Sequence, residues 1–364
     1  MSGASHPKVG LAFSGGGFRA TAFGLGALRA LHDRDVLGDV AVVSGISGGS
    51  LLTAMWAYGP ANFDEFDDTV TALLRRGLQR ELIRRTITPR RAAKNLASAV
   101  GAVLPGGLEQ NRRSTRTESL VDALAACGLG AKTMPEVTRP RLSTVISATD
   151  LSTGNAVRFG SDVSSCSPHG YISDTIPVAD AVAASAAFPV LLPQLNRSYM
   201  FNRTDGTRHR KTMLMTDGGV YDNLALSPLL PGRSRAHTSH VHELSYLIAV
   251  DAGVGRTAPR APNFWPGRMQ RSFAIAHTRA QDGSRTRIQD LGQNGRLEGF
   301  VYSYLGMRDS RLPVTVPDLV PRQGVYNYPT DFAPVESDAL DALTTRGEQL
   351  TRILIDSYCP RLGQ

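Results

Sequence analysis

Two strand–turn–helix patterns near the N-terminus constrain the fold most. In the first, apolar residues 9–13 lead into a glycine-rich turn and an Ala/Leu-rich segment that is helical to about residue 32. In the second, apolar residues 40–43 lead into another Gly/Ser turn, and the chain is helical from Leu51. Consecutive units of this kind predict an α/β fold with neighbouring parallel strands, whose turns meet at one edge of the sheet.

The second turn, Gly45-Ile46-Ser47-Gly48-Gly49, has the Gly-x-Ser-x-Gly form of a nucleophile elbow. Such a turn projects the serine hydroxyl out of the backbone, and the helix that follows directs free N–H groups toward negative charge. Taken alone, a Gly/Ser-rich turn that opens a helix explains the pentapeptide better, since the chain carries 36 glycines. Its sequence context has to support a catalytic role.

The first turn, Ser14-Gly15-Gly16-Gly17, can direct backbone N–H groups toward an anion. One interpretation is a nucleotide phosphate loop, but the turn fits neither the Gly-x-x-x-x-Gly-Lys-Ser/Thr nor the Gly-x-Gly-x-x-Gly pattern. The other is an oxyanion hole for a tetrahedral intermediate on Ser47. The order of the two turns favours the oxyanion hole.

Two later strands each end in an acid. Residues 211–215 read as a strand that leads to Asp217-Gly218-Gly219, and residues 246–250 read as one that ends at Asp251. Functional residues concentrate on the loops that follow strands, so both acids are candidate site residues. An aspartate that caps a turn is the alternative for each.

The rest of the chain gives coarser expectations. Residues 141–150 predict a strand with a hairpin-like return over 156–159, and helices are expected over 179–187 and 337–358. Residues 257–321 are polar, Arg-rich and less regular, with Trp265, Tyr302 and Tyr304 as candidate contact residues.

The composition, 41% hydrophobic and 20% charged, is typical of a globular protein, and no apolar stretch approaches the roughly 20 residues that span a bilayer. The N-terminus lacks the apolar region of a secretory signal, and the three cysteines form no framework. We therefore expect a cytoplasmic location and leave peripheral membrane attachment open.

The net charge of +8 is concentrated in one region. Residues 75–116 hold eleven Arg and Lys and two acids, which argues against a nucleic-acid partner and for one basic surface. Within residues 70–87, apolar side chains recur at helical spacing, while Arg76, Arg80 and Arg84 mark another face. This pattern suits an anionic membrane surface. A solvated face of a packed helix is the alternative.

Four motifs together resemble the patatin-like phospholipase family: Ser14-Gly-Gly-Gly-Phe-Arg19-Ala, Gly45-Ile-Ser47-Gly-Gly, Ala183-Ala-Ser-Ala-Ala-Phe-Pro189 and Asp217-Gly-Gly. The segment from Ala148 to Gly154 is also similar, with Asp150 matching the acid found there. Patatins usually have Asp where Ser14 stands, and this loop is closer to that of the related cytosolic phospholipases A2.

The resemblance implies a three-layer α/β/α fold with a mainly parallel central sheet. It implies a catalytic domain over residues 8–230, with a basic helical insertion or lid at about 62–116. Residues 231–364 are expected to form a C-terminal extension packed on the same α/β domain.

The resemblance also implies a lipid acyl hydrolase of the phospholipase A or lysophospholipase type, acting on lipid at a membrane surface. Ser47 matches the nucleophile and Asp217 its only partner, a dyad without histidine. Gly15, Gly16 and Gly17 match the oxyanion-hole glycines. Arg19 resembles the arginine that faces a lipid phosphate, with a structural ion pair as the alternative. Neither a metal nor a cofactor is implied.

Two rival hypotheses remain open. An α/β-hydrolase with a Ser-Asp-His triad is one, since His237, His240, His242 and His277 follow Asp217. A patatin-like fold used as a non-catalytic lipid-binding module is the other.

Overall fold

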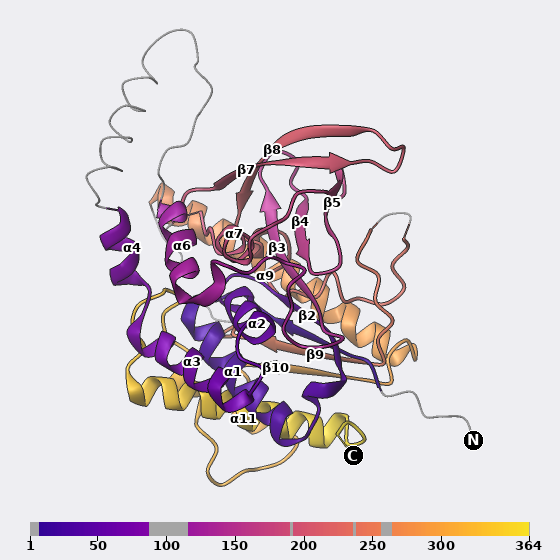
Figure 1. The fold of residues 1–364 in the computed structure, drawn as a ribbon. Helices are drawn as coiled ribbons and strands as arrows, with labels where there is room; N and C mark the ends of the chain where they lie inside the picture. Colours follow the sequence, from indigo (N-terminus) through magenta and orange to yellow (C-terminus); the bar gives the residue numbers. More distant parts are fainter. Residues whose placement is uncertain (1–6, 87–115, 190–191, 236–237, 256–263, 364) are drawn as a thin grey trace.

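The computed structural model describes residues 7–86, 116–189, 192–235, 238–255 and 264–363 (Figure 1). Most of the expected insertion or lid at 62–116 therefore lies outside the described residues. Its described part forms helices α3 (Phe63–Arg76) and α4 (Gln79–Thr86). The continuous amphipathic pattern predicted over residues 70–87 is interrupted at Gly77, where a positive φ of 74° ends α3.

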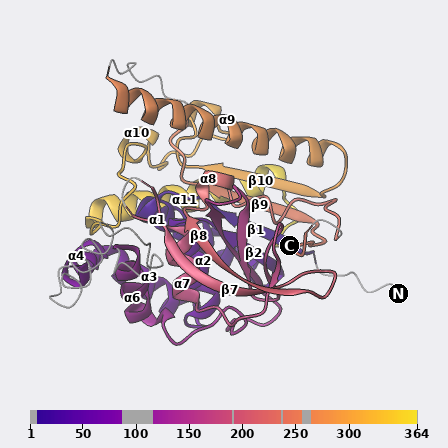
Figure 2. The same ribbon diagram turned by 90° about the horizontal axis from the view of Figure 1, so that it is seen from above.

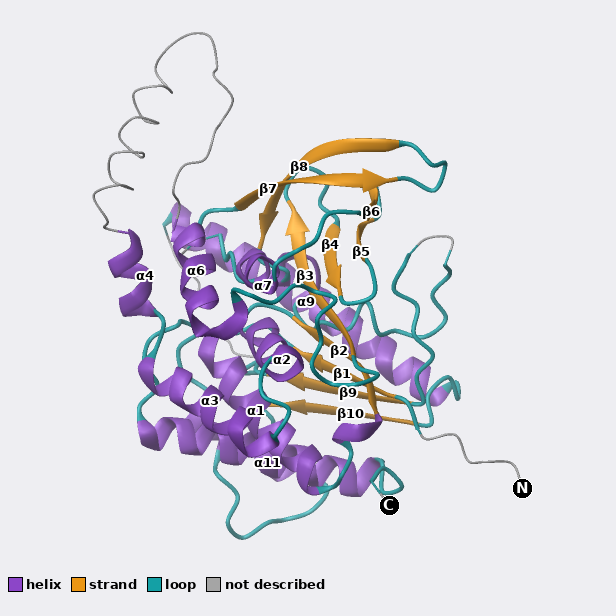
Figure 3. Ribbon diagram, viewed as in Figure 1, coloured by secondary structure: helices purple, strands orange, loops and turns teal. Residues whose placement is uncertain are grey.

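Five parallel strands form one half of a ten-stranded sheet (Figure 3). Their spatial order is β10 (Gly299–Tyr304), β9 (Tyr246–Asp251), β1 (Val9–Phe13), β2 (Val40–Gly45) and β3 (Ser143–Asp150). Parallel strands align their carboxyl ends, so the turns after β1, β2 and β9 lie at the same edge of the sheet. This edge carries the functional residues.

The other half of the sheet is antiparallel and closes on itself. It consists of β4 (Ala156–Gly160), β5 (Ser164–Cys166), β6 (Gly170–Ile172), β7 (Leu195–Asn202) and β8 (Arg208–Thr216). The last strand, β8, pairs back onto the end of β3, with Thr216 opposite Thr149. The expected mainly parallel sheet is therefore correct for five strands and wrong for the rest. Short hairpin connections, which cannot join parallel strands, account for the difference.

Helices cover both faces of the parallel strands (Figure 2). One face packs against α1 (Gly17–Asp33), α2 (Gly48–Tyr58) and α11 (Ser337–Tyr358), and the other against α8 (Gly219–Asp222) and α9 (Trp265–Gln293). Strand β9 shows the division, because Tyr246, Ile248 and Val250 join the first core while Leu247 and Ala249 join the second. The alternation follows the two-residue period of a strand. Helices α6 (Arg116–Leu124) and α7 (Val178–Ser185) complete the first face.

Residues 257–321 are more regular than predicted. They contain the 29-residue helix α9 and the strand β10, followed after residue 321 by the short helix α10 (Arg322–Val325). The periodicity of α9 is weak because most of its side chains are exposed, and Ile288 is a rare buried apolar residue on it. None of the described helices is both long and apolar enough to span a membrane.

Candidate active site

Ser47 lies at the junction of β2 and α2 in a strained conformation. Its φ of 52° and ψ of −119° fall where residues with side chains are rare, and such a backbone costs on the order of 1–3 kcal/mol. Contacts with the neighbouring turn hold it there: a Cβ on Gly48 would lie 1.9 Å from the carbonyl oxygen of Gly17. Only glycine permits this approach. The Gly-x-Ser-x-Gly pentapeptide therefore forms a strained strand-to-helix turn, as an elbow requires.

The Ser47 hydroxyl donates a hydrogen bond to the carboxylate of Asp217. Both residues are buried, with Asp217 only 4% exposed. Burial raises the pKa of Asp217 from its ordinary 3.8 to about 6, although hydrogen bonds from the Gly219 backbone (2.7 Å) and from Ser47 oppose the rise. A carboxylate with a higher pKa is a stronger base, and it is still ionised at neutral pH.

The closed antiparallel half of the sheet places Asp217 next to Ser47. Strand β8 ends beside β3, and the Thr149 hydroxyl of β3 donates to the Asp217 carbonyl at 2.9 Å. Because β3 is the neighbour of β2, the turn after β8, which carries Asp217, lies beside the turn after β2, which carries Ser47. This juxtaposition depends on pairing between residues that are far apart in the sequence.

The end of α7 holds the loop that carries Ser47 and the loop that carries Asp217. The Ser185 hydroxyl accepts the Ser47 backbone N–H at 3.0 Å, and the Ser185 carbonyl accepts the Gly218 N–H at 3.1 Å. The Ala187 carbonyl accepts the Asp217 N–H at 3.0 Å. The sequence motif Ala183–Pro189 had suggested family membership, but no role for Ser185. A lone polar residue within a run of alanines was the available signal.

The glycine-rich loop lies against the elbow. Gly16 (φ 146°) and Gly17 (φ 53°) adopt backbone conformations that favour glycine, and a Cβ on Gly15 would lie 3.4 Å from the Ser47 Cβ. The Gly15 N–H donates to the Asn223 carbonyl at 3.0 Å. Within the described residues, no acceptor takes the N–H of Gly16 or Gly17. Those two amides are the ones available to an incoming oxyanion.

Arg19 lies on the first turn of α1 beside this loop. Its Nη1 donates to the Tyr328 carbonyl at 2.8 Å, while its buried Nε has no hydrogen-bond partner among the described residues. Burial lowers the pKa of Arg19 to about 10, and the nearby charge of Asp251 partly offsets this. No ion pair of Arg19 is found among the described residues. Its guanidinium therefore retains hydrogen-bonding capacity beside Gly16 of the glycine-rich loop.

An apolar crevice leads to Ser47. Its walls come from α2, α6, α7 with the residue that follows it, and a later loop. The lining residues are Leu51, Leu120, Leu124, Val182, Ala186 and Phe332. Side chains fill the crevice, which leaves no room for a water molecule. Phe332 comes from a segment without a recognisable motif. It packs edge-on against Phe18, whose N–H donates to the Asp331 carbonyl at 2.9 Å.

The described histidines of the rival triad differ in their surroundings. His240 is buried against Ser165 of β5, and burial lowers its pKa to about 3. Burial also lowers the pKa of His277, while a hydrogen bond with the Gly219 backbone opposes this effect. His237 lies outside the described residues. Among the described residues, the groups that shift the pKa of Asp217 by hydrogen bonding are Gly219 and Ser47, and no histidine is one of them.

The other two candidate acids do not join the dyad. Asp150 accepts hydrogen bonds from the backbone and hydroxyl of Thr153 and from the Leu214 N–H, and so fixes the turn after β3. Asp251 is buried in an ion pair with Arg285 at 2.9 Å. Both therefore have structural partners. In the described part of the chain, His, Cys, Asp and Glu do not gather in groups of three that could hold a metal ion.

Comparisons with known proteins agree with this geometry. The family model described as "Patatin-like phospholipase" matches residues 11–230. No curated protein matches the chain.

Among solved structures, human GIVD cytosolic phospholipase A2, in a complex with methyl gamma-linolenyl fluorophosphonate and terbium chloride, is similar with a TM-score of 0.52 and 13% identity. A second structure of that enzyme gives 0.50 and 14%. These matches cover 97% and 96% of this chain and 58% of the human chain, so this chain spans little more than half of that protein.

VipD from Legionella pneumophila gives a TM-score of 0.41 at 16% identity, covering 97% of this chain and 67% of VipD. Similarities at these identities concern the fold alone. The family match extends over more than half of the chain and includes Ser47, Asp217 and the glycine-rich loop. The chain therefore belongs to the patatin-like phospholipase family.

Proposed function

We propose that this protein is a serine lipid acyl hydrolase in which Ser47 is the nucleophile and Asp217 its base. The observation that carries the proposal is the hydrogen bond from a strained, buried serine to a buried aspartate of raised pKa. Burial of an ionisable carboxylate costs folding free energy, and an aspartate with a purely structural role would not require that cost. Membership of a phospholipase family supports the same chemistry.

The proposed reaction proceeds through an acyl-enzyme. Ser47 Oγ attacks the carbonyl carbon of an acyl ester as its proton passes to Asp217. The amides of Gly16 and Gly17 would stabilise the oxyanion, and the proton then leaves with the alcohol. Water, deprotonated by Asp217, attacks the acyl-enzyme, and the fatty acid departs. One carboxylate serves both halves of the reaction.

The apolar crevice at Ser47 supports a lipid substrate. Its walls carry leucine, valine, alanine and phenylalanine side chains, which suit an acyl chain and offer nothing to a polar one. Arg19 would face a phosphate head group, which gives the proposal its phospholipase A or lysophospholipase form.

We further propose that the enzyme is cytoplasmic and works at a membrane surface. Arg76, Arg80 and Arg84 on α3 and α4 would attract anionic head groups electrostatically. Arg84 pairs with Glu81 at 2.8 Å, so its share is smaller. Binding to anionic vesicles should weaken in the triple glutamine variant, and unchanged binding would exclude this surface.

The domain division is also a proposal. Residues 8–230 would form the catalytic domain, and residues 231–364 an extension of the same α/β domain. The range of the family match supports the first part. The positions of β9 beside β1 and of α11 against α1 support the second.

Lipid products identified by mass spectrometry test the function most directly. Wild-type protein incubated with phospholipid and lysophospholipid vesicles should release fatty acid. Ser47→Ala and Asp217→Asn should each lose activity by about a thousandfold or more, because the two residues act as a unit. A fluorophosphonate should label Ser47 in the wild type alone.

Histidine substitutions separate the dyad from the triad. His240→Ala and His277→Ala should retain hydrolysis to within a few-fold. A loss as complete as that of Ser47→Ala would instead establish a triad. Absence of both hydrolysis and fluorophosphonate labelling in the folded wild type would favour a non-catalytic lipid-binding module.

A further inference from the structure

A second cavity lies away from Ser47, at the same edge of the sheet. Its volume is about 780 Å³, and it opens beyond the carboxyl ends of β9 and β10. The residues that line it come from the end of α9, from β10, and from the chain after each strand; the charged ones are Asp282, Arg285, Arg308, Arg311 and Arg322. Ligands of α/β proteins bind outside strand ends of this kind.

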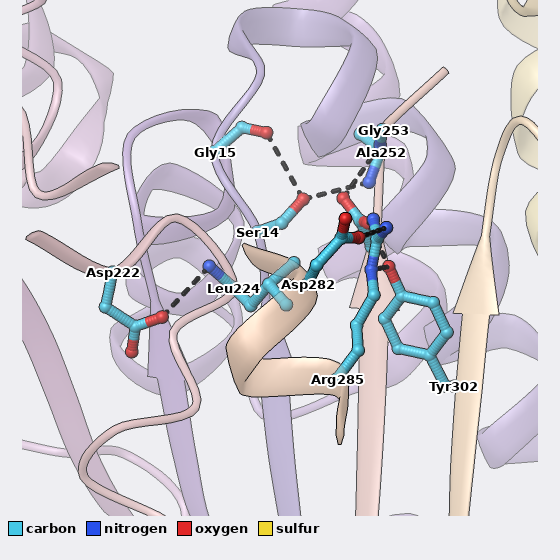
Figure 4. A network of polar contacts seen from close by, with 10 residues as sticks. Ser14, Gly15, Asp222, Leu224, Ala252, Gly253, Asp282, Arg285 and Tyr302 are labelled. Atoms are coloured by element: carbon cyan, nitrogen blue, oxygen red, sulfur yellow. Dashed lines mark hydrogen bonds and ion pairs between the residues drawn. The ribbon is translucent and has the colours of Figure 1, made fainter. Parts of the chain in front are cut away.

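One of the four arginines is already neutralised. Arg285 forms ion pairs with Asp251 at 2.9 Å and with Asp282 at 3.2 Å, and it also donates to the Tyr302 hydroxyl at 2.6 Å. It stacks 5.1 Å from the centre of the Tyr302 ring. Figure 4 shows this cluster beneath Ala252, whose N–H donates to the Ser14 hydroxyl at 2.9 Å. Arg285 thus forms a fixed wall of the cavity.

For the guanidinium groups of the other three arginines, the described residues provide no carboxylate partner. Arg308 and Arg311 are exposed, and neither makes an ion pair with any described residue. Arg322 donates only to carbonyl oxygens, those of Gly306 at 2.9 Å and Val254 at 3.2 Å. The nearby acid, Asp309, pairs with the buried Arg346 at 3.0 Å. Positive charge at the cavity is therefore left uncompensated.

Like charges repel when they are gathered around one cavity, and an anion relieves that repulsion. Guanidinium groups present paired N–H donors that match phosphate oxygens. The cavity is also lined by the aromatic rings of Phe300, Tyr302 and Tyr304, and its size suits a small organic molecule. We propose that this cavity binds a phosphate group carried by a molecule with an apolar or planar part.

The cavity is distinct from the proposed catalytic site. Strands β9 and β1 stand between β10, which lines the cavity, and β2, which leads to Ser47. A soluble phosphate ester and a phosphate-bearing lipid head group offer the same chemistry to the arginines. Binding can be measured with the full-length Ser47→Ala variant, so the test does not depend on hydrolysis.

Two probes distinguish the sources. Inorganic pyrophosphate is titrated calorimetrically at constant ionic strength, and phosphatidylcholine vesicles with or without phosphatidic acid are used in flotation. Arg308→Gln with Arg311→Gln removes two exposed charges from the cavity. Arg208→Gln with Arg210→Gln removes two exposed charges from β8 as the matched control. Melting temperatures of both variants verify that they fold.

Pyrophosphate binding that the cavity variant weakens about tenfold or more, with the control little changed, supports a soluble phosphate ligand. Flotation that requires phosphatidic acid and is lost in the cavity variant alone supports a lipid head group. Absence of both kinds of binding overturns the proposal. An equal loss in the cavity and control variants also overturns it, because the effect is then one of overall charge.

Discussion

The raised pKa of Asp217 predicts that this residue destabilises the protein at neutral pH. Asp217→Asn keeps the size of the side chain and an oxygen that can accept the Gly219 N–H, which lies 2.7 Å away in the wild type. The substitution removes the charge that burial penalises. We expect Asp217→Asn to gain stability relative to the wild type as the pH rises.

The sign and magnitude follow from the two pKa values of the wild type. Below pH 3.8 the carboxyl is protonated in both the folded and the unfolded chain, so it imposes no ionisation cost. Above 3.8 the unfolded chain ionises first, and the wild type loses folding free energy until the pH passes about 6. The total loss is about 3 kcal/mol, at roughly 1.4 kcal/mol for each pH unit.

Urea unfolding of both proteins between pH 4 and pH 8 measures this effect. The difference in unfolding free energy between the variant and the wild type cancels the other titrating groups, and over this pH range it should rise by about 2.5 kcal/mol, mostly below pH 6.5. Asp68→Asn, at an exposed position, is the control for loss of a surface carboxylate. A flat difference for Asp217→Asn, or one that falls with pH, would refute the assignment of a desolvated carboxylate.

Three further predictions follow from the same structure. The log of kcat/KM for ester hydrolysis should rise with pH and level off above about 6, because Asp217 must be ionised to accept a proton; a plateau that extends to pH 4 would contradict this role. Ser185→Ala removes the acceptor of the Ser47 N–H (3.0 Å) and should lower the unfolding free energy by about 1–3 kcal/mol. Its kcat should fall further than the kcat of variants that lose the same stability at other positions. Arg346→Met removes a buried guanidinium, leaves the half-buried carboxylate of Asp309 and three carbonyls without their donor, and should cost about 3 kcal/mol or more in urea unfolding, whereas Arg352→Met, in a partly exposed pair, should cost about 1 kcal/mol or less.

The elements that carry Ser47 and Asp217 could be predicted because each has a local signal. A short apolar strand, a glycine turn and an apolar helix are all recorded in neighbouring residues, and β1, β2, α1 and α2 form where the pattern indicates. The helix predicted over 337–358 also forms with those bounds.

The parts that could not be predicted depend on distant contacts. The closure of β8 onto β3 joins residues more than sixty positions apart, and no local pattern records it. Helix α9 has little apolar periodicity, so it owes its order to packing on the sheet rather than to a local signal. Phe332 reaches the Ser47 crevice from a segment whose residues indicate only a loop.

Catalysis by this dyad would require burial and access at the same site. Burial raises the pKa of Asp217, and apolar side chains fill the crevice at the neighbouring Ser47, Phe332 among them. An acyl chain that displaces Phe332 would occupy the same apolar volume and leave Asp217 dehydrated. A short, water-soluble ester would open the crevice without filling it, and water would then lower the pKa of the carboxylate. We therefore expect the enzyme to prefer long acyl chains, through the strength of the base as well as through binding.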